Sequence, residues 1–258
     1  MELDVQALAR RLDSARLEGR EVERLTLQAP DLSLEQAYLI MDAGVALRQA
    51  RGERQVGLKM GLTSEAKRTQ MGLGAPIYGV LTDVMRVRDT FHMAGTLHPK
   101  IEPEIAFHFA RGLRGRLGRR EVMAACTGVC AALEILDSRY RDFKYFSLPD
   151  VVADNASGSH FILGERWLPV TGLSLAEVEL AMSVDGVLRQ KAKGSAISGD
   201  PWLSVVQLCE LMTSRGHSLP DDSIVLAGAA TVAEPLRVGQ VVSLQVGSLP
   251  PLTVSIAA

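Results

Sequence analysis

Two glutamates interrupt an apolar segment in the stretch His98-Pro-Lys-Ile-Glu-Pro-Glu-Ile-Ala-Phe107. Residues two apart in a β-strand point to the same face, so Glu102 and Glu104 are predicted to stand side by side while the flanking isoleucines face the other way. Pro103 between them has no amide hydrogen to donate to a neighbouring strand, which favours an edge strand or a bulge. Adjacent carboxylates repel each other, and burying an unpaired one is costly. The stretch therefore predicts a strand that presents its carboxylates to a cationic group.

A third glutamate stands alone in the apolar run 131–136, Ala-Ala-Leu-Glu-Ile-Leu. Carboxylate oxygens are the ligands that hard divalent cations such as Mg²⁺ and Mn²⁺ prefer, and these ions usually keep positions open for water and substrate. Glu102, Glu104 and Glu134 are therefore candidate metal ligands. The residues alone leave a second interpretation open, in which the three glutamates face solvent on amphipathic strands. A zinc site is less favoured, because the histidines at 92, 98 and 108 are irregularly spaced and no HExxH motif is present.

The composition is that of an ordinary globular protein: of 258 residues, 47% are hydrophobic and 22% are charged. A net charge of −2 gives no electrostatic reason to expect a nucleic acid or an anionic membrane as a partner. The first residues lack the basic and apolar segments of a signal peptide, and the 3 cysteines form no CxxC pair, so a cytoplasmic location is expected. Cys126 and Cys130, four residues apart in an apolar stretch, are interpreted as helical core residues.

The chain is predicted to have an α+β fold with two parts. A helical N-terminal portion at 1–52 precedes a β-rich catalytic body at 53–258. Within the first part, Ser33 and Gln36 have the spacing of a capping box, so a helix is expected to begin after Ser33.

Two local patterns organise the body. Asp185 and Gly186 between apolar segments predict the tight turn of a β-hairpin. Asp200 and Pro201 supply the N-cap and the first residue of a helix that continues to about Arg215. Further strands are expected at 55–58, 80–87, 178–184, 187–191, 223–226 and 241–246, with the two glutamates on another, and helices near 64–71 and 121–129.

Six stretches carry a combined signal: 56–64 (VGLKMGLTS), 70–72 (QMG), 76–79 (PIYG), 98–105 (HPKIEPEI), 134–140 (EILDSRY) and 151–157 (VVADNAS). Together they resemble the hydratase/decarboxylase branch of the fumarylacetoacetate hydrolase superfamily, in the same order and along nearly the whole chain. Each stretch alone would be a weak signal, but the combination is specific. The resemblance implies a mixed β-roll as the catalytic body, behind the helical N-terminal portion.

The resemblance also implies a Mg²⁺ or Mn²⁺ ion held by a Glu-x-Glu pair and a third glutamate, and these positions match Glu102, Glu104 and Glu134. Lys59 stands where the family has an active-site lysine, whose ammonium would hold a substrate carboxylate or donate a proton. Residue type alone would equally allow a surface lysine there. No nicotinamide, flavin or pyridoxal cofactor is implied, in keeping with the lack of a dinucleotide fingerprint or a P-loop.

Further contacts to the substrate are expected from Tyr78, Ser157 and Thr231. Ser157 could as well be an ordinary turn serine, and Thr231 is placed near the pocket because it follows a small-residue run before the C-terminal strands. Asp137 and Arg139 are expected to form a structural ion pair beneath the site.

The implied reaction is metal-dependent decarboxylation of 2-oxohex-3-enedioate to 2-oxopent-4-enoate or its enol, 2-hydroxypenta-2,4-dienoate, and CO₂, in the meta-cleavage degradation of aromatic compounds. The nearest alternative is hydration of 2-hydroxypenta-2,4-dienoate at the same metal site. The hydratases resemble Asp-Phe-Gly where this chain has Ile77, Tyr78 and Gly79, and an isoleucine cannot transfer protons, which favours decarboxylation.

Two further alternatives are acylpyruvate hydrolysis, for which His160 is a candidate base, and a non-catalytic metal-binding assembly protein. As partners, the resemblance implies a homo-oligomer and a complex with the hydratase of the same pathway.

Overall fold

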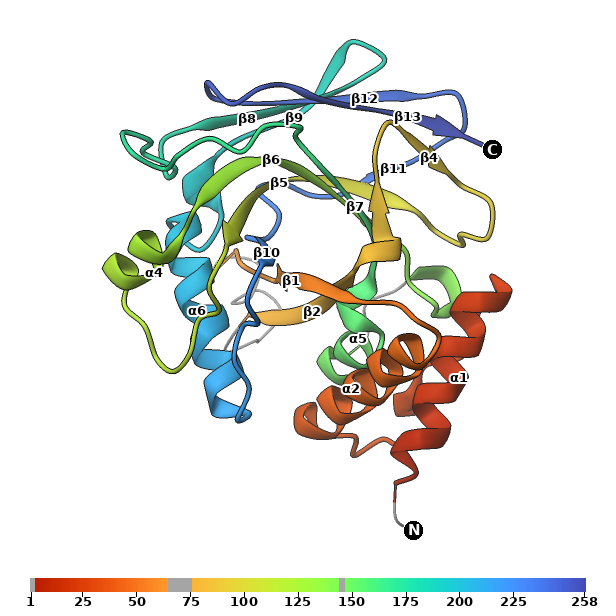
Figure 1. Ribbon diagram of the computed structural model, residues 1–258. Helices are drawn as coiled ribbons and strands as arrows, with labels where there is room; N and C mark the ends of the chain where they lie inside the picture. The colour runs from red at the N-terminus through yellow and green to blue at the C-terminus, as the bar shows by residue number, and fades with distance from the viewer. Residues whose placement is uncertain (1–2, 65–75, 144–146) are drawn as a thin grey trace.

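The computed structural model describes residues 3–64, 76–143 and 147–258. Its N-terminal portion contains two helices, α1 (Val5–Glu18) and α2 (Leu34–Ala50), which lie together at one end of the molecule (Figure 1). Helix α2 begins where the capping box predicts, since the Ser33 hydroxyl accepts from Gln36 N at 3.1 Å and the Gln36 side chain accepts from Ser33 N at 2.9 Å. Helix α2 contacts both α1 and the short helix α5 (Leu148–Ala153), and buried residues of α1 and α2 belong to the main apolar cluster of the protein.

An eight-stranded mixed sheet forms the centre of the body. Its strands run in the order β2-β1-β10-β5-β6-β7-β3, and β11 pairs with β5 beside β10. The β1–β10 and β3–β7 pairs are parallel and the others are antiparallel. The bounds are β1 Gln55–Gly61, β2 Ile77–Thr82, β3 Arg86–Val87, β5 Lys100–Phe109, β6 Gly128–Leu136, β7 Gly158–Leu163, β10 Ser223–Leu226 and β11 Glu234–Pro235.

A five-stranded sheet lies across the end of the body opposite the N-terminal helices, in the order β4-β13-β12-β8-β9 (Figure 1). As predicted, Asp185 and Gly186 turn the hairpin between β8 and β9, both with positive φ (52° and 75°). The bounds are β4 Thr90–His92, β8 Glu179–Val184, β9 Val187–Lys193, β12 Val241–Val246 and β13 Leu252–Ala257.

One longer helix packs against the eight-stranded sheet. Helix α6 (Pro201–Ser214) begins at the predicted N-cap, where the Asp200 side chain accepts from Trp202 N at 3.1 Å. The Trp202 ring then packs against Phe107 of β5, with 4.5 Å between the ring centroids. One continuous apolar cluster joins residues of the N-terminal helices to residues of both sheets. The division of the chain into 1–52 and 53–258 stays a prediction.

Helix α4 (Arg119–Ala125) is shorter than expected, and this corrects the interpretation of two cysteines. Cys126 follows the end of the helix, and Cys130 lies in β6, so neither is a helical residue. All nine residues of β6 are buried, and a fully buried apolar run has no periodicity that separates a strand from a helix. The three cysteines are free.

The strand expected at 80–87 is interrupted after Thr82. The Asp83 carboxylate accepts from the backbone amides of Arg54 at 2.9 Å and Val84 at 3.0 Å, which favours a turn over a continued strand. The helix expected near 64–71 falls almost entirely outside the described residues.

Pro103 does not mark an edge strand, because β5 lies inside the sheet between β10 and β6. Its carbonyl accepts from Ala230 N at 3.2 Å, so this side of Pro103 faces the loop at 227–233, between β10 and β11. On its other edge β5 pairs with β6 here, but on this edge β10 pairs only from Ala106 onward and β11 only at 100–101, so among the described residues no strand needs the missing amide hydrogen. The prediction of an edge strand is therefore wrong, but the sheet does open locally at Pro103, beside the glutamates.

Among the described residues, no helix combines the length and the apolar character needed to cross a bilayer.

Candidate metal centre and active site

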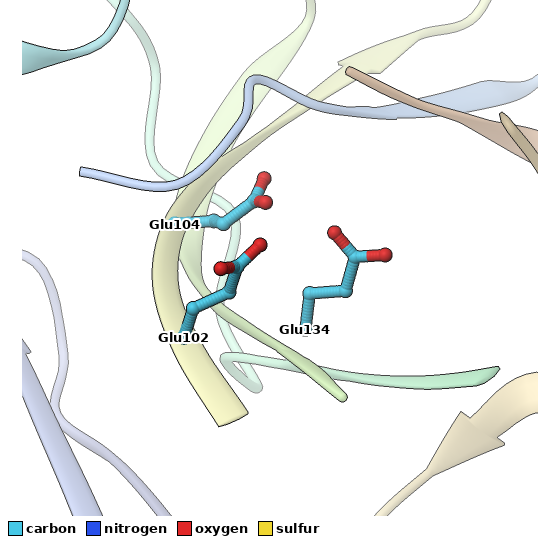
Figure 2. Close-up of side chains that lie close together, drawn as sticks. All are labelled: Glu102, Glu104 and Glu134. Carbon is cyan, nitrogen blue, oxygen red and sulfur yellow. The ribbon is translucent and has the colours of Figure 1, made fainter. Parts of the chain in front are cut away.

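The pairing of β5 with β6 brings the three glutamates together. Glu102 lies directly opposite Glu134 across the antiparallel ladder, and Glu104 follows on the same face two residues later. One carboxylate oxygen from each residue lies within 4.8 Å of the others. Figure 2 shows Glu102 and Glu104 projecting from β5 toward the side on which Glu134 stands. The predicted side-by-side arrangement is confirmed, and the solvent-facing interpretation is wrong for two of the three residues, because Glu104 is 0% and Glu134 1% exposed.

The two buried carboxylates of this group, those of Glu104 and Glu134, have too few hydrogen-bond donors. Glu104 Oε1 and both oxygens of Glu134 are buried and accept no hydrogen bond within the described part of the chain. Burial, and then the charges of Glu134 and Glu102, raise the pKa of Glu104 well above its usual value. Buried carboxylates without donors destabilise a fold unless a positive charge compensates. Together with Glu102, these two carboxylates form an all-oxygen set that fits a hard divalent cation.

A glycine in the loop after β10 orients Glu104. The amide of Gly228 donates to Glu104 Oε2 at 2.7 Å. Gly228 has a φ of +102°, and a Cβ atom at this position would lie 2.4 Å from Thr63 Cγ2. Any larger residue would therefore displace the amide that fixes this carboxylate.

Lys59 of β1 completes the charged cluster. Its ammonium nitrogen lies 3.0 Å from Glu134 Oε1 and donates to the carbonyl of Ala156 at 2.6 Å. The contact with Glu134 is an ion pair by distance but not an aligned hydrogen bond, so both oxygens of Glu134 remain without a hydrogen-bond donor in the described part of the chain. At 2% exposure, Lys59 is a buried residue, so the surface interpretation is wrong.

The carbonyl that receives Lys59 belongs to a strained turn, Asn155–Ser157. Its three residues have positive φ values of 52°, 50° and 56°, each of which costs about 1 kcal/mol or more for a residue with a side chain. The Asn155 side chain holds the turn against β2: its Oδ1 accepts from Val80 N at 2.7 Å, and its Nδ2 donates to Val80 O at 2.9 Å. Sequence reasoning missed this role of Asn155, although asparagine is a residue type that tolerates left-handed turns.

A buried ion pair supports the same turn, but its partners differ from those expected. Arg139 pairs with Asp154 and also donates from Nη2 to the Asp154 carbonyl at 2.6 Å. The Asp137 carboxylate instead accepts from the backbone amides of His98 at 2.6 Å and of Leu97. The prediction of an Asp137–Arg139 ion pair is wrong, because the Asp137 carboxylate is occupied by these backbone amides, and Asp154, 15 residues further along the chain, occupies the guanidinium.

A cavity of about 340 Å³ opens beside the glutamates. Its polar lining includes Lys59, Lys100 and Glu102, and its apolar lining includes Leu62, Leu136, Val151 and Val232. Ser157 is buried next to Ala156, which lines the cavity. Thr231 belongs to the loop whose neighbours Ala229 and Val232 line it, and its hydroxyl donates to Val232 O at 3.2 Å. The roles of Ser157 and Thr231 in binding a substrate stay predictions.

The position of Tyr78 corrects its assignment to substrate binding. In the β1–β2 ladder, Lys59 pairs with Gly79 and Met60 pairs with Tyr78, so Tyr78 lies on the opposite face of the sheet from Lys59. Its hydroxyl accepts from Arg215, and its ring stacks on Tyr38 at 4.9 Å between centroids. We therefore place Tyr78 outside the site.

The positions of Ile77 and His160 bear on the two alternative reactions, hydration and acylpyruvate hydrolysis. Ile77 is buried opposite Gly61 and shares the sheet face of Lys59. His160 lines a different cavity, together with Arg16, Arg48 and Arg139. The described residues that line the glutamate cavity include no histidine, so the arrangement does not support His160 as a base for hydrolysis.

Comparison with known proteins agrees with this geometry. The family model described as "Fumarylacetoacetate (FAA) hydrolase C-terminal" matches residues 64–257. A 4-oxalocrotonate decarboxylase from a Pseudomonas species is 41% identical over 255 residues, which cover 98% of both chains. A 2-hydroxyhexa-2,4-dienoate hydratase from Comamonas testosteroni is 32% identical and covers 91% of this chain and 90% of its own.

A solved structure shares the architecture over nearly its full length. It is the 4-oxalocrotonate decarboxylase from Pseudomonas putida G7, complexed with magnesium and adipate. The two structures superpose with a TM-score of 0.94 at 34% sequence identity, covering 98% of this chain and 97% of the other. From the carboxylate trio, the family model and these relatives, we conclude that the chain belongs to the fumarylacetoacetate hydrolase family.

Proposed function

We propose that this protein is a metal-dependent decarboxylase that converts 4-oxalocrotonate (2-oxohex-3-enedioate) to 2-hydroxypenta-2,4-dienoate, or its keto form 2-oxopent-4-enoate, and CO₂. One observation carries the proposal: three carboxylates, two of them buried with too few hydrogen-bond donors, converge beside a cavity that a buried lysine also lines. The full-length relatives named 4-oxalocrotonate decarboxylase support the choice of reaction.

Glu102, Glu104 and Glu134 would hold the cation. A divalent ion together with the Lys59 ammonium would neutralise the three carboxylates, which explains how the fold tolerates them. The relative from Pseudomonas putida G7 is complexed with magnesium, and we propose Mg²⁺ here, with Mn²⁺ as an ion that the same oxygen ligands would accept. When bound, the cation supplies Lewis-acid stabilisation of the negative charge that develops on the C2 oxygen of the substrate.

In the reaction, the bond between C5 and C6 breaks and C6 leaves as CO₂. The electron pair of that bond forms the C4–C5 double bond, and the C3–C4 electrons move to C2–C3 while the C2 carbonyl electrons move onto oxygen. We propose that the Lys59 ammonium, which lies 3.0 Å from Glu134 Oε1, donates a hydrogen bond or a proton to the C2 oxygen. The carbonyl of Ala156 fixes the ammonium in that position. Ser157 and Thr231 are proposed to hydrogen-bond to the substrate.

The apolar part of the lining favours the departure of CO₂. Leu62, Leu136 and Val151 line the cavity with groups that cannot solvate the charge of a carboxylate, so most of the hydration of the leaving carboxylate would be lost on binding. Loss of that charge as neutral CO₂ is therefore easier in the cavity than in water.

Hydration of 2-hydroxypenta-2,4-dienoate is the second candidate, because relatives named as hydratases are 32–34% identical to this chain. Adding water requires a group that moves a proton to carbon. The position on the sheet face of Lys59 that could supply a carboxylate is occupied by Ile77. This favours decarboxylation.

Two activities measured side by side test the proposal. CO₂ release from 2-oxohex-3-enedioate and hydration of 2-hydroxypenta-2,4-dienoate are each followed with Mg²⁺ and with excess EDTA. We expect Mg²⁺-dependent CO₂ release without comparable hydration. Hydration without CO₂ release would support the second candidate and would overturn the first. Neither activity, with binding of a 2-oxo acid unchanged in EDTA, would indicate a non-catalytic protein.

We further propose a cytoplasmic location, which the three free cysteines support, and a place in the meta-cleavage degradation of aromatic compounds. The family resemblance supports a homo-oligomer and a complex with the pathway hydratase.

A further inference from the structure

A second lysine lines the cavity. Lys100 lies at the start of β5, two residues before Glu102 and therefore on the same face of the strand. In the ladder it stands opposite Leu136 of β6, which also lines the cavity. Residues two apart along a strand are separated by about 6.6 Å, a distance on the scale of a six-carbon dicarboxylic acid.

The two cavity lysines differ in how their charges are balanced. Lys59 is held by Glu134 and by the Ala156 carbonyl. The Lys100 ammonium lies 4.1 Å from the centre of the Phe143 ring. In residues 3–64, 76–143 and 147–258, Lys100 forms no ion pair, although the residue is half-buried. The aromatic ring stabilises a cation there without neutralising it.

We propose that Lys100 binds the distal carboxylate of a dicarboxylic 2-oxo acid and so makes the site selective for dianionic over monoanionic substrates. This inference rests on the proposed function, because it assumes that the 2-oxo acid end of the substrate lies at the three glutamates. The apolar lining gives the selectivity its physical basis, since a second carboxylate placed there without a cation would lose its hydration uncompensated.

The contact has a kinetic signature. The pair between Lys100 and the carboxylate exists in the substrate complex and is lost as that carboxylate becomes neutral CO₂. Removing the ammonium should therefore weaken substrate binding and raise KM while kcat is unchanged or higher. A residue with only a structural role would instead change stability or cation affinity, and a proton donor would lower kcat.

Binding of two matched acids tests the proposal without turnover. Calorimetry with the Mg²⁺-loaded protein compares adipate, a six-carbon diacid, with hexanoate, the monoacid of the same length. We expect the wild type to prefer adipate and Lys100→Met to lose roughly ten- to a hundredfold of that preference. Lys100→Arg should keep most of it. Lys191→Met, which removes an exposed lysine paired with Glu179 on the five-stranded sheet, should leave it unchanged.

Three results would overturn the inference: no preference for adipate in the wild type, an unchanged preference in Lys100→Met, or an equal loss in Lys191→Met. Thermal unfolding and Mg²⁺ affinity of each variant show whether Lys100→Met is folded. If it is not folded, the comparison of Lys100→Arg with the wild type still tests the proposal. Failure of the proposed function is distinguishable, because it would appear as no CO₂ release from the wild type while the adipate preference still depends on Lys100.

Discussion

The charge on Glu104 should destabilise the protein when no cation is bound and stabilise it when one is. Its carboxylate lies within 4.8 Å of the other two, and at an effective dielectric constant of about 20 two unit charges at that separation repel by about 3.5 kcal/mol. Glu104 can take up a proton instead, since burial and its neighbours raise its pKa well above the usual value. The repulsion that remains in the cation-free protein is therefore smaller, and we expect about 1–2 kcal/mol.

Glu104→Gln removes this charge and keeps an oxygen that can accept from the Gly228 amide. In EDTA, the variant should have a free energy of unfolding about 1–2 kcal/mol higher than the wild type. With Mg²⁺ at about a hundred times the dissociation constant, the wild type should gain about 2.7 kcal/mol, and the variant should gain much less because one charged ligand is missing.

Urea denaturation of both proteins, with EDTA and with Mg²⁺, measures these four values. Glu179→Gln, which removes an exposed carboxylate on the five-stranded sheet, is the control and should shift stability by less than about 0.5 kcal/mol in either condition. The reasoning is refuted if Glu104→Gln is less stable than the wild type in EDTA and gains as much from Mg²⁺. Such a result would make Glu104 an ordinary structural residue.

Three further changes have separate expected outcomes. Lys59→Met should lower the rate of CO₂ release by at least about a hundredfold while Mg²⁺ still binds in calorimetry, and a near-normal rate would remove Lys59 from the mechanism. Asn155→Ala leaves the backbone groups of Val80 without their partner and should lower the free energy of unfolding by about 1–3 kcal/mol, measured in urea, and reduce turnover by releasing the Ala156 carbonyl. Burial lowers the pKa of His160 to about 4 from 6.5, so the unfolded chain binds a proton between these pH values that the folded chain does not, and stability falls as pH falls through this window. His160→Gln should reduce the loss of unfolding free energy between pH 6.5 and 4 by at most about 3 kcal/mol. Identical pH profiles for the variant and the wild type would contradict the lowered pKa of His160.

Local rules predicted much of this fold. The capping box at Ser33 and the tight turn at Asp185 depend on residues within a few positions of each other, and both are observed. The shared face of Glu102 and Glu104 follows from the two-residue period of a strand, whichever strands lie beside it. These predictions hold because they need no knowledge of distant partners.

The predictions that were wrong concern features that depend on residues far away in the sequence. Whether Pro103 marks an edge depends on the loop after β10, more than a hundred residues later in the chain. The sequence leads one to expect Tyr78 at the substrate, but a strand has two faces, and only its pairing with β1 shows that Gly79, and not Tyr78, stands next to Lys59. The part played by Asn155 was missed because its hydrogen bonds join a turn to β2, and nothing in a short stretch of sequence shows that contact.

The dependence of CO₂ release on free Mg²⁺ tests the central claim most directly. The rate of CO₂ release from 2-oxohex-3-enedioate is measured over a titration of free Mg²⁺, and calorimetry gives the binding isotherm of the same protein. If Glu102, Glu104 and Glu134 hold the cation that serves the reaction, the two curves have the same midpoint, and Glu134→Gln shifts both to higher Mg²⁺. CO₂ release that persists in excess EDTA, or a rate curve that Glu134→Gln leaves in place, would contradict the account.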